Sequence, residues 1–295
     1  MKKREHFVPQ FYLKSFTDNN GLLHVFDRKE DTYFTCKPEN ICLERNLYET
    51  EWENANEKLG KFVLQNSIED NFAVAEERYS NILKKLLSVC IKDQNPNAII
   101  TVTSERKVLI SFIVNLYLRN PWTMKELDVD GISNDINENE EIEIIRKLLD
   151  QTGFGGTDSL IKVAKKEVYL TEKYEGGMAF RLCKCIEDIN VLFFFSEEDA
   201  FTTCSFPAQI GEDPTSIGEN HMCAFLPLSP HVAVLFGNYK DMTNKKNRMV
   251  KIETKDAMLL NKEVFQKPID QIRYVIGNSD DIIRKCVVNK KKNQE

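Results

Sequence analysis

The chain has 295 residues, of which 42% are hydrophobic and 10% aromatic, a composition ample for a sizeable core and typical of a globular protein. Its 40 Lys and Arg residues against 46 Asp and Glu residues give a net charge of -6. This balance excludes the global basic surface by which a protein holds nucleic acid nonspecifically, so nucleic acid would have to bind at a local site.

The sequence also carries information on the cellular location of the protein. No apolar window approaches the roughly 20 residues of a transmembrane helix, and the N-terminus lacks the apolar region of a secretion signal. The eight cysteines are scattered, which suits reduced thiols better than a disulfide framework. We therefore expect a cytoplasmic protein without membrane association, and we expect the short basic runs at 2–4 and 290–292 to be solvated.

The first predicted element is a short helix that begins at Pro9, because the fixed φ and missing N–H of proline suit the first helical position. His6 comes just before its N-terminus. One face of the helix is apolar and consists of Tyr12, Leu13 and Phe16. After a turn, the segments 22–28 and 31–36 alternate enough to predict a β-hairpin.

Helical spacing of apolar residues then extends from 56 to 87, where Gly60 is the only residue that disfavours a helix. The next helix is predicted from Ser104 to 119–120, because Pro121 disfavours helical geometry in the residue before it. Near 128–141 the sequence predicts an acidic surface loop whose end starts another helix.

The last part of the chain changes character. Helices are predicted over 157–170, 178–190, 255–266, 268–276 and 280–287. Short apolar runs between charged, Gly or Pro breaks predict strands at 191–197, 200–206, 222–229 and 231–237. The sequence thus indicates an α+β fold: a predominantly helical single domain over 1–288, with a small, mostly antiparallel sheet built from both ends of the chain, and a basic tail at 289–295.

Two carboxylates interrupt the apolar stripe of the helix predicted over 56–87. The stripe passes through Leu59, Phe62, Asn66, Glu69, Phe72, Glu76, Tyr79, Leu83 and Leu86. Burying Glu69 and Glu76 without partners would be costly, so the pattern points to hydrogen bonds, a cation or a metal nearby. The alternative is that the stripe is tilted and both side chains reach solvent at its edge.

Two more polar residues are candidates for the same site. Arg119 shares a helix face with Phe112 and Asn115, and its guanidinium would suit either a buried carboxylate or a substrate phosphate, although a cation in a last helical turn also stabilises the helix dipole. His6, next to a helix N-terminus, would be a neutral base, nucleophile or metal ligand. It could equally anchor the start of the fold.

Several blocks resemble one family in the order in which they occur: HFVPQFYLKSF, LHVFDRK, NICLERNLYE, IEDNFAVAEERYSNIL, FIVNLYLRNP, AFTTCSFP and FLPLSP. They are similar to the mainly bacterial family catalogued as domain of unknown function 4238, over residues 4–285, and H-x-x-P-Q-x-Y-L is the most specific piece. The resemblance implies one family domain and places the family pattern on His6, Pro9, Gln10, Asn46, Tyr48, Glu69, Glu76 and Arg119.

The chain departs from the family pattern at one position. A block resembling F-I-T-S-D-N-P usually carries an Asp where this chain has Ser205. If that Asp is a ligand or base in relatives, this chain would be inactive, altered or reliant on Glu69 and Glu76 instead.

Two hypotheses follow for the function. The first is a phosphodiester hydrolase, a nuclease effector in toxin or phage-defence settings, that binds nucleic acid at a local site. Glu69, Glu76 and His6 would hold a divalent metal ion or a water, Gln10 would orient His6, and Arg119 would stabilise phosphate charge. The same residues also suit acid–base cleavage without metal. The second is a noncatalytic binding or protein-interaction module, with a protein partner or as a homo-oligomer, in which a buried His/Glu/Arg network fixes the helices.

Overall fold

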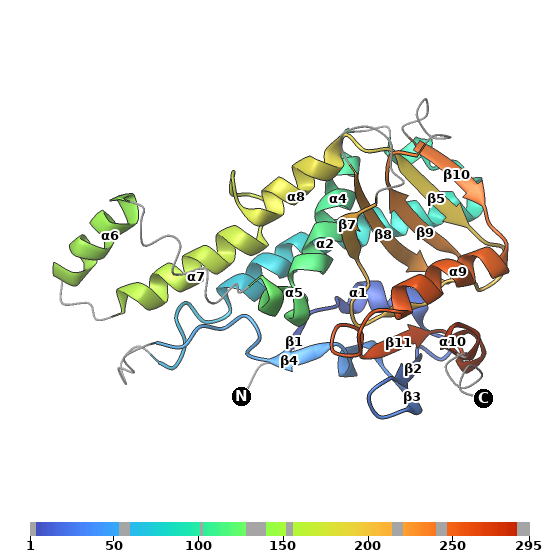
Figure 1. Cartoon of the computed structure of the whole chain (residues 1–295), viewed down its shortest axis with the longest axis horizontal. Helices are drawn as coiled ribbons and strands as arrows, with labels where there is room; N and C mark the ends of the chain where they lie inside the picture. Colours follow the sequence, from blue (N-terminus) through green and yellow to red (C-terminus); the bar gives the residue numbers. More distant parts are fainter. Residues whose placement is uncertain are drawn as a thin grey trace.

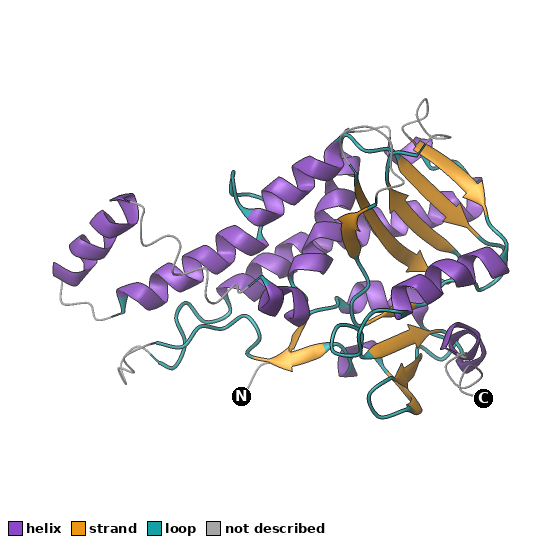
Figure 2. Cartoon of the chain, viewed as in Figure 1, coloured by secondary structure: helices purple, strands orange, loops and turns teal. Residues whose placement is uncertain are grey.

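The structure, a computed structural model, describes residues 4–52, 60–100, 103–127, 140–151, 156–213, 221–239 and 247–287. Within these residues the chain has the predicted α+β architecture, in which long helices pack beside a five-stranded sheet (Figures 1 and 2). The predicted basic tail at 289–295 and most of the acidic loop near 128–141 lie outside the described residues.

The described strands are mostly antiparallel, as predicted, and divide among three sheets. The largest has the order β10 (Asn247–Lys251), β5 (Val191–Phe195), β9 (Val232–Phe236), β8 (Met222–Ser229) and β7 (Gln209–Glu212), with β10 parallel to β5. The second has the order β3 (Thr32–Cys36), β2 (Leu23–Asp27), β11 (Tyr274–Gly277) and β6 (Thr203–Cys204), so both ends of the chain contribute to it. The third pairs β1 (Arg4–His6) with β4 (Leu43–Arg45).

The helices follow the apolar periodicity closely in the second half of the chain. Their bounds are α1 Gln10–Leu13, α2 Ser67–Ser88, α3 Asn97–Ile100, α4 Thr103–Leu118, α5 Pro121–Glu126, α6 Glu140–Gln151, α7 Thr157–Leu170, α8 Met178–Glu187, α9 Thr254–Phe265 and α10 Asp280–Val287. The short α1 continues as a 3₁₀ helix over Lys14–Phe16. The helices predicted over 157–170, 178–190, 255–266 and 280–287 are therefore confirmed.

Two predictions about these elements are wrong. The long helix begins at Ser67 rather than in the fifties: 60–66 is not helical, Leu64 and Asn66 have positive φ, and Phe62 forms an isolated bridge to Glu51. Residues 56–59 lie outside the described part of the chain. The segment 268–276, predicted as helix, ends in β11, because pairing with β2 and β6 overrides a local pattern that is ambiguous for so short an apolar run.

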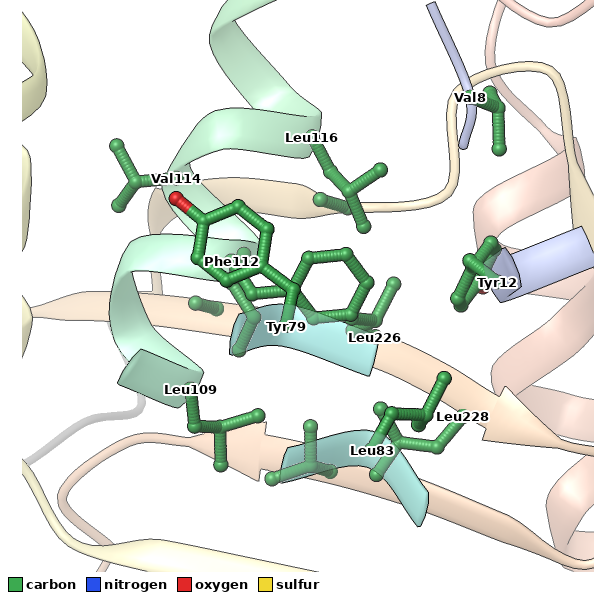
Figure 3. Close-up of a cluster of buried hydrophobic side chains, with 14 of the residues drawn as sticks. Val8, Tyr12, Tyr79, Leu83, Leu109, Phe112, Val114, Leu116, Leu226 and Leu228 are labelled. Carbon is green, nitrogen blue, oxygen red and sulfur yellow. The ribbon is translucent and has the colours of Figure 1, made fainter. Parts of the chain in front are cut away.

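The opening segment is a core element that joins the two larger sheets. Pro9 is the N-cap residue of α1, one position before the first helical position predicted for it, and Figure 1 shows α1 between the sheets. The fully buried Tyr12 hydroxyl donates to the backbone oxygen of Pro227 in β8 at 2.7 Å, and it lies 2.8 Å from the Thr203 hydroxyl in β6. Figure 3 shows Val8 and Tyr12 in one cluster with α2, α4 and β8, represented by Tyr79, Leu83, Leu109, Phe112, Leu116, Leu226 and Leu228.

Candidate functional site

The predicted site residues lie in β1, α1 and α2 and directly after α4. β1 carries His6 and is held by its pairing to β4 and by the N–H of Phe7, which donates to the backbone oxygen of Cys42 at 3.0 Å. α2 presents Glu69 and Glu76. Arg119 directly follows α4, and its own N–H still donates to the backbone oxygen of Asn115 at 3.0 Å.

Arg119 is only 1% exposed, and each nitrogen of its guanidinium has a partner. Nη1 donates to Glu76 Oε1 at 2.7 Å and to Asn115 Oδ1 at 3.4 Å. Nη2 donates to the backbone oxygen of His6, and Nε donates to the Tyr48 hydroxyl at 3.3 Å. The Tyr48 hydroxyl in turn donates to the backbone oxygen of Arg119 at 3.2 Å. All three nitrogens of this side chain are therefore engaged within the protein, through four of its five N–H groups.

The guanidinium also lies over the ring of Phe72, 4.5 Å from its centroid, a cation–π contact. Burial alone would lower the pKa of Arg119, but Tyr48 and Glu76 outweigh that effect and the pKa lies above its ordinary value. We call the group around this cation the Arg119 cluster: His6, Tyr48, Phe72, Glu76, Asn115 and Arg119. It ties β1, the segment after β4, α2 and α4 to one charged centre.

His6 differs from Arg119 in having a buried polar atom that is not engaged. Its Nε2 is buried and has no hydrogen-bond partner among the described residues. Burial lowers the pKa of His6, and the positive charge of Arg119 lowers it further, whereas the backbone of Glu39 and the charge of Glu76 act in the opposite direction. The imidazole is therefore neutral near pH 7, as the sequence predicts, although burial and Arg119 rather than a helix end are the cause.

Glu69 lies near Tyr48 and near a carboxylate that the sequence did not single out. Glu5 is fully buried, and its Oε2 accepts from the N–H of Tyr48 at 3.0 Å. Glu5, Tyr48, Asn66 and Glu69 help line a cavity of about 10 Å³, the size of one water molecule. Glu5 was missed because it stands in a charged run without periodicity, so that only the pairing of β1 with β4 shows its burial.

The remaining predicted site residue is not joined to the cluster. Gln10 begins α1, and within the described residues its side chain forms no hydrogen bond to His6 or Arg119. Among those residues, no three or more His, Cys, Asp or Glu side chains lie close enough to hold a metal ion. The structure thus brings His6, Glu76 and Arg119 together but does not arrange Glu69, Glu76 and His6 as metal ligands. A divalent metal ion stays a prediction.

A cavity of about 430 Å³ lies next to the cluster, and sequence reasoning did not find it. We call it the α5 cavity. Its lining consists of Phe7, Asn40, Ile41, Cys42, Leu43, Glu44, Asn120, Pro121, Trp122, Ser205, Asp270, Gln271, Arg273 and Tyr274. Phe7 directly follows His6, and Asn120 directly follows Arg119. The cluster therefore holds the backbone of two segments of its wall.

The side chain of Asn120 organises that wall further. Its Oδ1 accepts from the N–H of Trp122 at 3.0 Å, which caps α5, and its Nδ2 donates to the backbone oxygen of Ser205 at 2.8 Å. The Ser205 hydroxyl accepts from the N–H groups of Arg273 and Tyr274 at 3.0 and 3.2 Å. An Asp at this position, as the family pattern has it, could accept from the same two donors, which gives the position a structural use.

These features define an α+β protein whose N-terminal segment is fixed in the core by a buried arginine. The chain belongs to the family described as "Protein of unknown function (DUF4238)", whose model matches residues 4–281, so the resemblance seen in the sequence is confirmed. Neither a curated protein nor a solved structure matches the chain. In the part of the chain that the structure describes, no helix is both long and apolar enough to cross a membrane.

Proposed function

We propose that the protein is a noncatalytic binding module in which the Arg119 cluster is a scaffold and the α5 cavity receives the ligand. The observation that carries this proposal is the burial of Arg119 with every guanidinium nitrogen engaged. A guanidinium that is to meet a substrate phosphate needs an accessible N–H. Here the N–H groups are directed at Glu76, Tyr48 and the backbone of His6 instead.

The position of the cluster supports the same proposal. A buried ion pair contributes little net stability compared with apolar residues, but it can specify one arrangement of the elements that it joins. In this chain the specified elements include the two wall segments at Phe7 and Asn120. The cavity volume of about 430 Å³ lies within the range of roughly 300–1,000 Å³ that is typical of small-molecule sites.

The test separates scaffold from catalyst by comparing stability with activity. Wild type and Glu76→Gln are melted in parallel and incubated with RNA, single-stranded DNA and duplex DNA, with and without Mg²⁺ or Mn²⁺. We expect no cleavage by either protein and a clear loss of thermal stability in the variant. Cleavage by wild type that disappears in Glu76→Gln at an unchanged melting temperature would overturn the binding-module proposal.

A second candidate function is a phosphodiester hydrolase, a nuclease effector in toxin or phage-defence settings. The observation that favours it is the buried, unpartnered Nε2 of His6, whose lowered pKa leaves a neutral base near Glu76. The arrangement suits acid–base cleavage by His6 and Glu76, with Arg119 as a positioning residue. In the cleavage assay, His6→Gln would then lose activity at every pH, while the exposed control Glu77→Gln would retain it.

A further inference from the structure

The α5 cavity has walls suited to a flat ring. Phe7, Trp122 and Tyr274 line it, and each of the last two also contacts another side chain. The ring of Trp122 lies 5.7 Å from that of Phe206, centroid to centroid. The guanidinium of Arg273 lies 4.9 Å from the ring centroid of Tyr274. Aromatic rings and guanidinium planes are the surfaces on which proteins stack a nucleobase.

Some polar side chains of the lining are bonded within the protein, and others are open to solvent or to a ligand. Asn120 and Ser205 use their side chains within the protein, as described above. By contrast, the side chains of Asn40, Glu44 and Gln271 form no hydrogen bond or ion pair with any other described residue. These three line the cavity together with Arg273. They offer a carboxylate acceptor and two amides that both donate and accept.

Arg273 adds one more donor. Its Nε and Nη2 are directed at Asp27, with Nη2 2.7 Å from Asp27 Oδ2, while Nη1 forms no hydrogen bond within the described part of the chain. A ligand that meets this lining needs N–H donors for Glu44 and acceptors for Arg273 and the amides. Guanine combines both: N1–H and the N2 amino group can donate to one carboxylate, and O6 and N7 accept from arginine.

The charge of the lining selects against phosphate. Glu44 and Asp270 are acidic, and the only other charged residue of the lining, Arg273, is already paired with Asp27. Glu44 is an exposed residue of β4 whose carboxylate lines the cavity, so a ligand can donate to it without displacing a protein partner. The net negative lining disfavours an anionic group but not a neutral nucleoside.

We propose that the α5 cavity binds guanosine, with the base against Trp122 and Tyr274 and its N–H edge on Glu44. This inference rests on the proposed binding function and names the ligand class of that site. The competing small ligand for an acidic, aromatic cavity is an organic cation such as choline, held by cation–π contacts. The already bound guanidinium of Arg273 on Tyr274 opposes a second cation at that ring.

The chain contains two tryptophans, Trp52 and Trp122, so Trp52→Phe turns Trp122 into the only tryptophan reporter of the cavity. The variant is titrated with guanosine, adenosine, cytidine, guanosine 5′-monophosphate and choline while tryptophan fluorescence is followed. Calorimetry on the wild-type chain repeats each titration, in case Trp52→Phe does not fold. We expect saturable quenching by guanosine and at least about tenfold weaker binding of adenosine, whose N1 is an acceptor facing Glu44.

Variants then test the contacts. Glu44→Gln should weaken guanosine binding by about tenfold or more, because a carboxamide offers one acceptor where two donors need to be met. The matched control Glu39→Gln removes a neighbouring carboxylate that does not line the cavity and should bind as wild type does. Guanosine 5′-monophosphate should bind more weakly than guanosine, and the difference should shrink as salt rises.

The outcomes separate this inference from the proposed function. Saturable binding of choline or adenosine but not guanosine would overturn the ligand class while leaving a binding module in place. Equal weakening by Glu44→Gln and Glu39→Gln would overturn the proposed contact. Absence of binding by every compound up to millimolar concentration would overturn the guanosine proposal, and the nucleic-acid cleavage assay decides the binding module independently.

Discussion

Removing the charge of Glu76 should cost the protein a substantial part of its stability. In Glu76→Gln the side chain keeps its shape and one acceptor for Arg119 Nη1, but the buried guanidinium loses its counterion. Two unit charges roughly 4 Å apart attract by about 4 kcal/mol at an effective dielectric constant near 20. The retained hydrogen bond returns about 1 kcal/mol, and because Glu76 is 27% exposed, water screens part of the rest. We expect a net loss of about 2–3 kcal/mol.

The assay is thermal unfolding followed by circular dichroism, with urea melts to give the free energy of unfolding. For a chain of this size, a loss of about 2–3 kcal/mol lowers the melting temperature by about 5 °C. Glu77→Gln, one residue along α2 and exposed, is the matched control and should change stability by less than about 0.5 kcal/mol. Glu76→Gln introduced into the Arg119→Met variant should cost far less stability, because the guanidinium charge that Glu76→Gln leaves unpaired in the wild type is already absent.

Two results would refute this reasoning. One is a melting temperature of Glu76→Gln equal to that of Glu77→Gln, which would mean that the ion pair does not stabilise the fold. The other is full additivity of Glu76→Gln and Arg119→Met, which would mean that the two side chains do not interact in solution.

Three further predictions concern single residues. The pKa of His6 in the folded protein lies below its ordinary 6.5, so the unfolded chain binds more protons in the pH range between the two pKa values. The free energy of unfolding therefore falls as the pH decreases through that range, and His6→Gln should flatten this part of the pH profile of urea melts. Tyr12→Phe should lose about 1–3 kcal/mol in the same melts, because it removes the hydroxyl that bonds to both larger sheets. Ser205→Ala should lose about 1–3 kcal/mol by leaving two N–H groups unpaired, whereas Ser205→Asp, which keeps acceptors for both, should stay within about 1 kcal/mol of wild type.

Local patterns in the sequence were sufficient to predict an element where it is long or is bounded by clear Gly, Pro or capping residues. The helix over 157–170 has several turns of apolar spacing and is found at Thr157–Leu170. The short strands β1, β4 and β7 have no such pattern, because three or four residues cannot show a period, and only their partners define them. The start of α2 was predicted too early because apolar residues keep a helical spacing upstream of Ser67. The left-handed backbone conformation of Asn66 prevents the helix from extending further toward the N-terminus.

The candidate site likewise has features that the sequence could predict and features that it could not. The proximity of His6, Glu76 and Arg119 was predictable, because polar groups on apolar faces have to find partners. The divalent metal ion stays a prediction, and the spacing of the two carboxylates proposed to bind it argues against a shared ion. Glu69 and Glu76 share a face of α2, but seven residues of helix separate them by roughly 10.5 Å along the axis, too far for one ion to bind both directly. The α5 cavity could not be predicted at all, because its lining comes from segments far apart in the chain.

The polar cluster and the cavity are linked by adjacency in the chain. Arg119 fixes the backbone at His6, and the next residue, Phe7, is a wall of the α5 cavity. Arg119 itself precedes Asn120, which caps α5 and so sets the position of Trp122. A displacement of the guanidinium would therefore move both wall segments together. The H-x-x-P-Q-x-Y-L block and the R-N-P sequence thus act as one unit: the buried charge sets their backbones, and the residues that follow it form the surface that a ligand would meet.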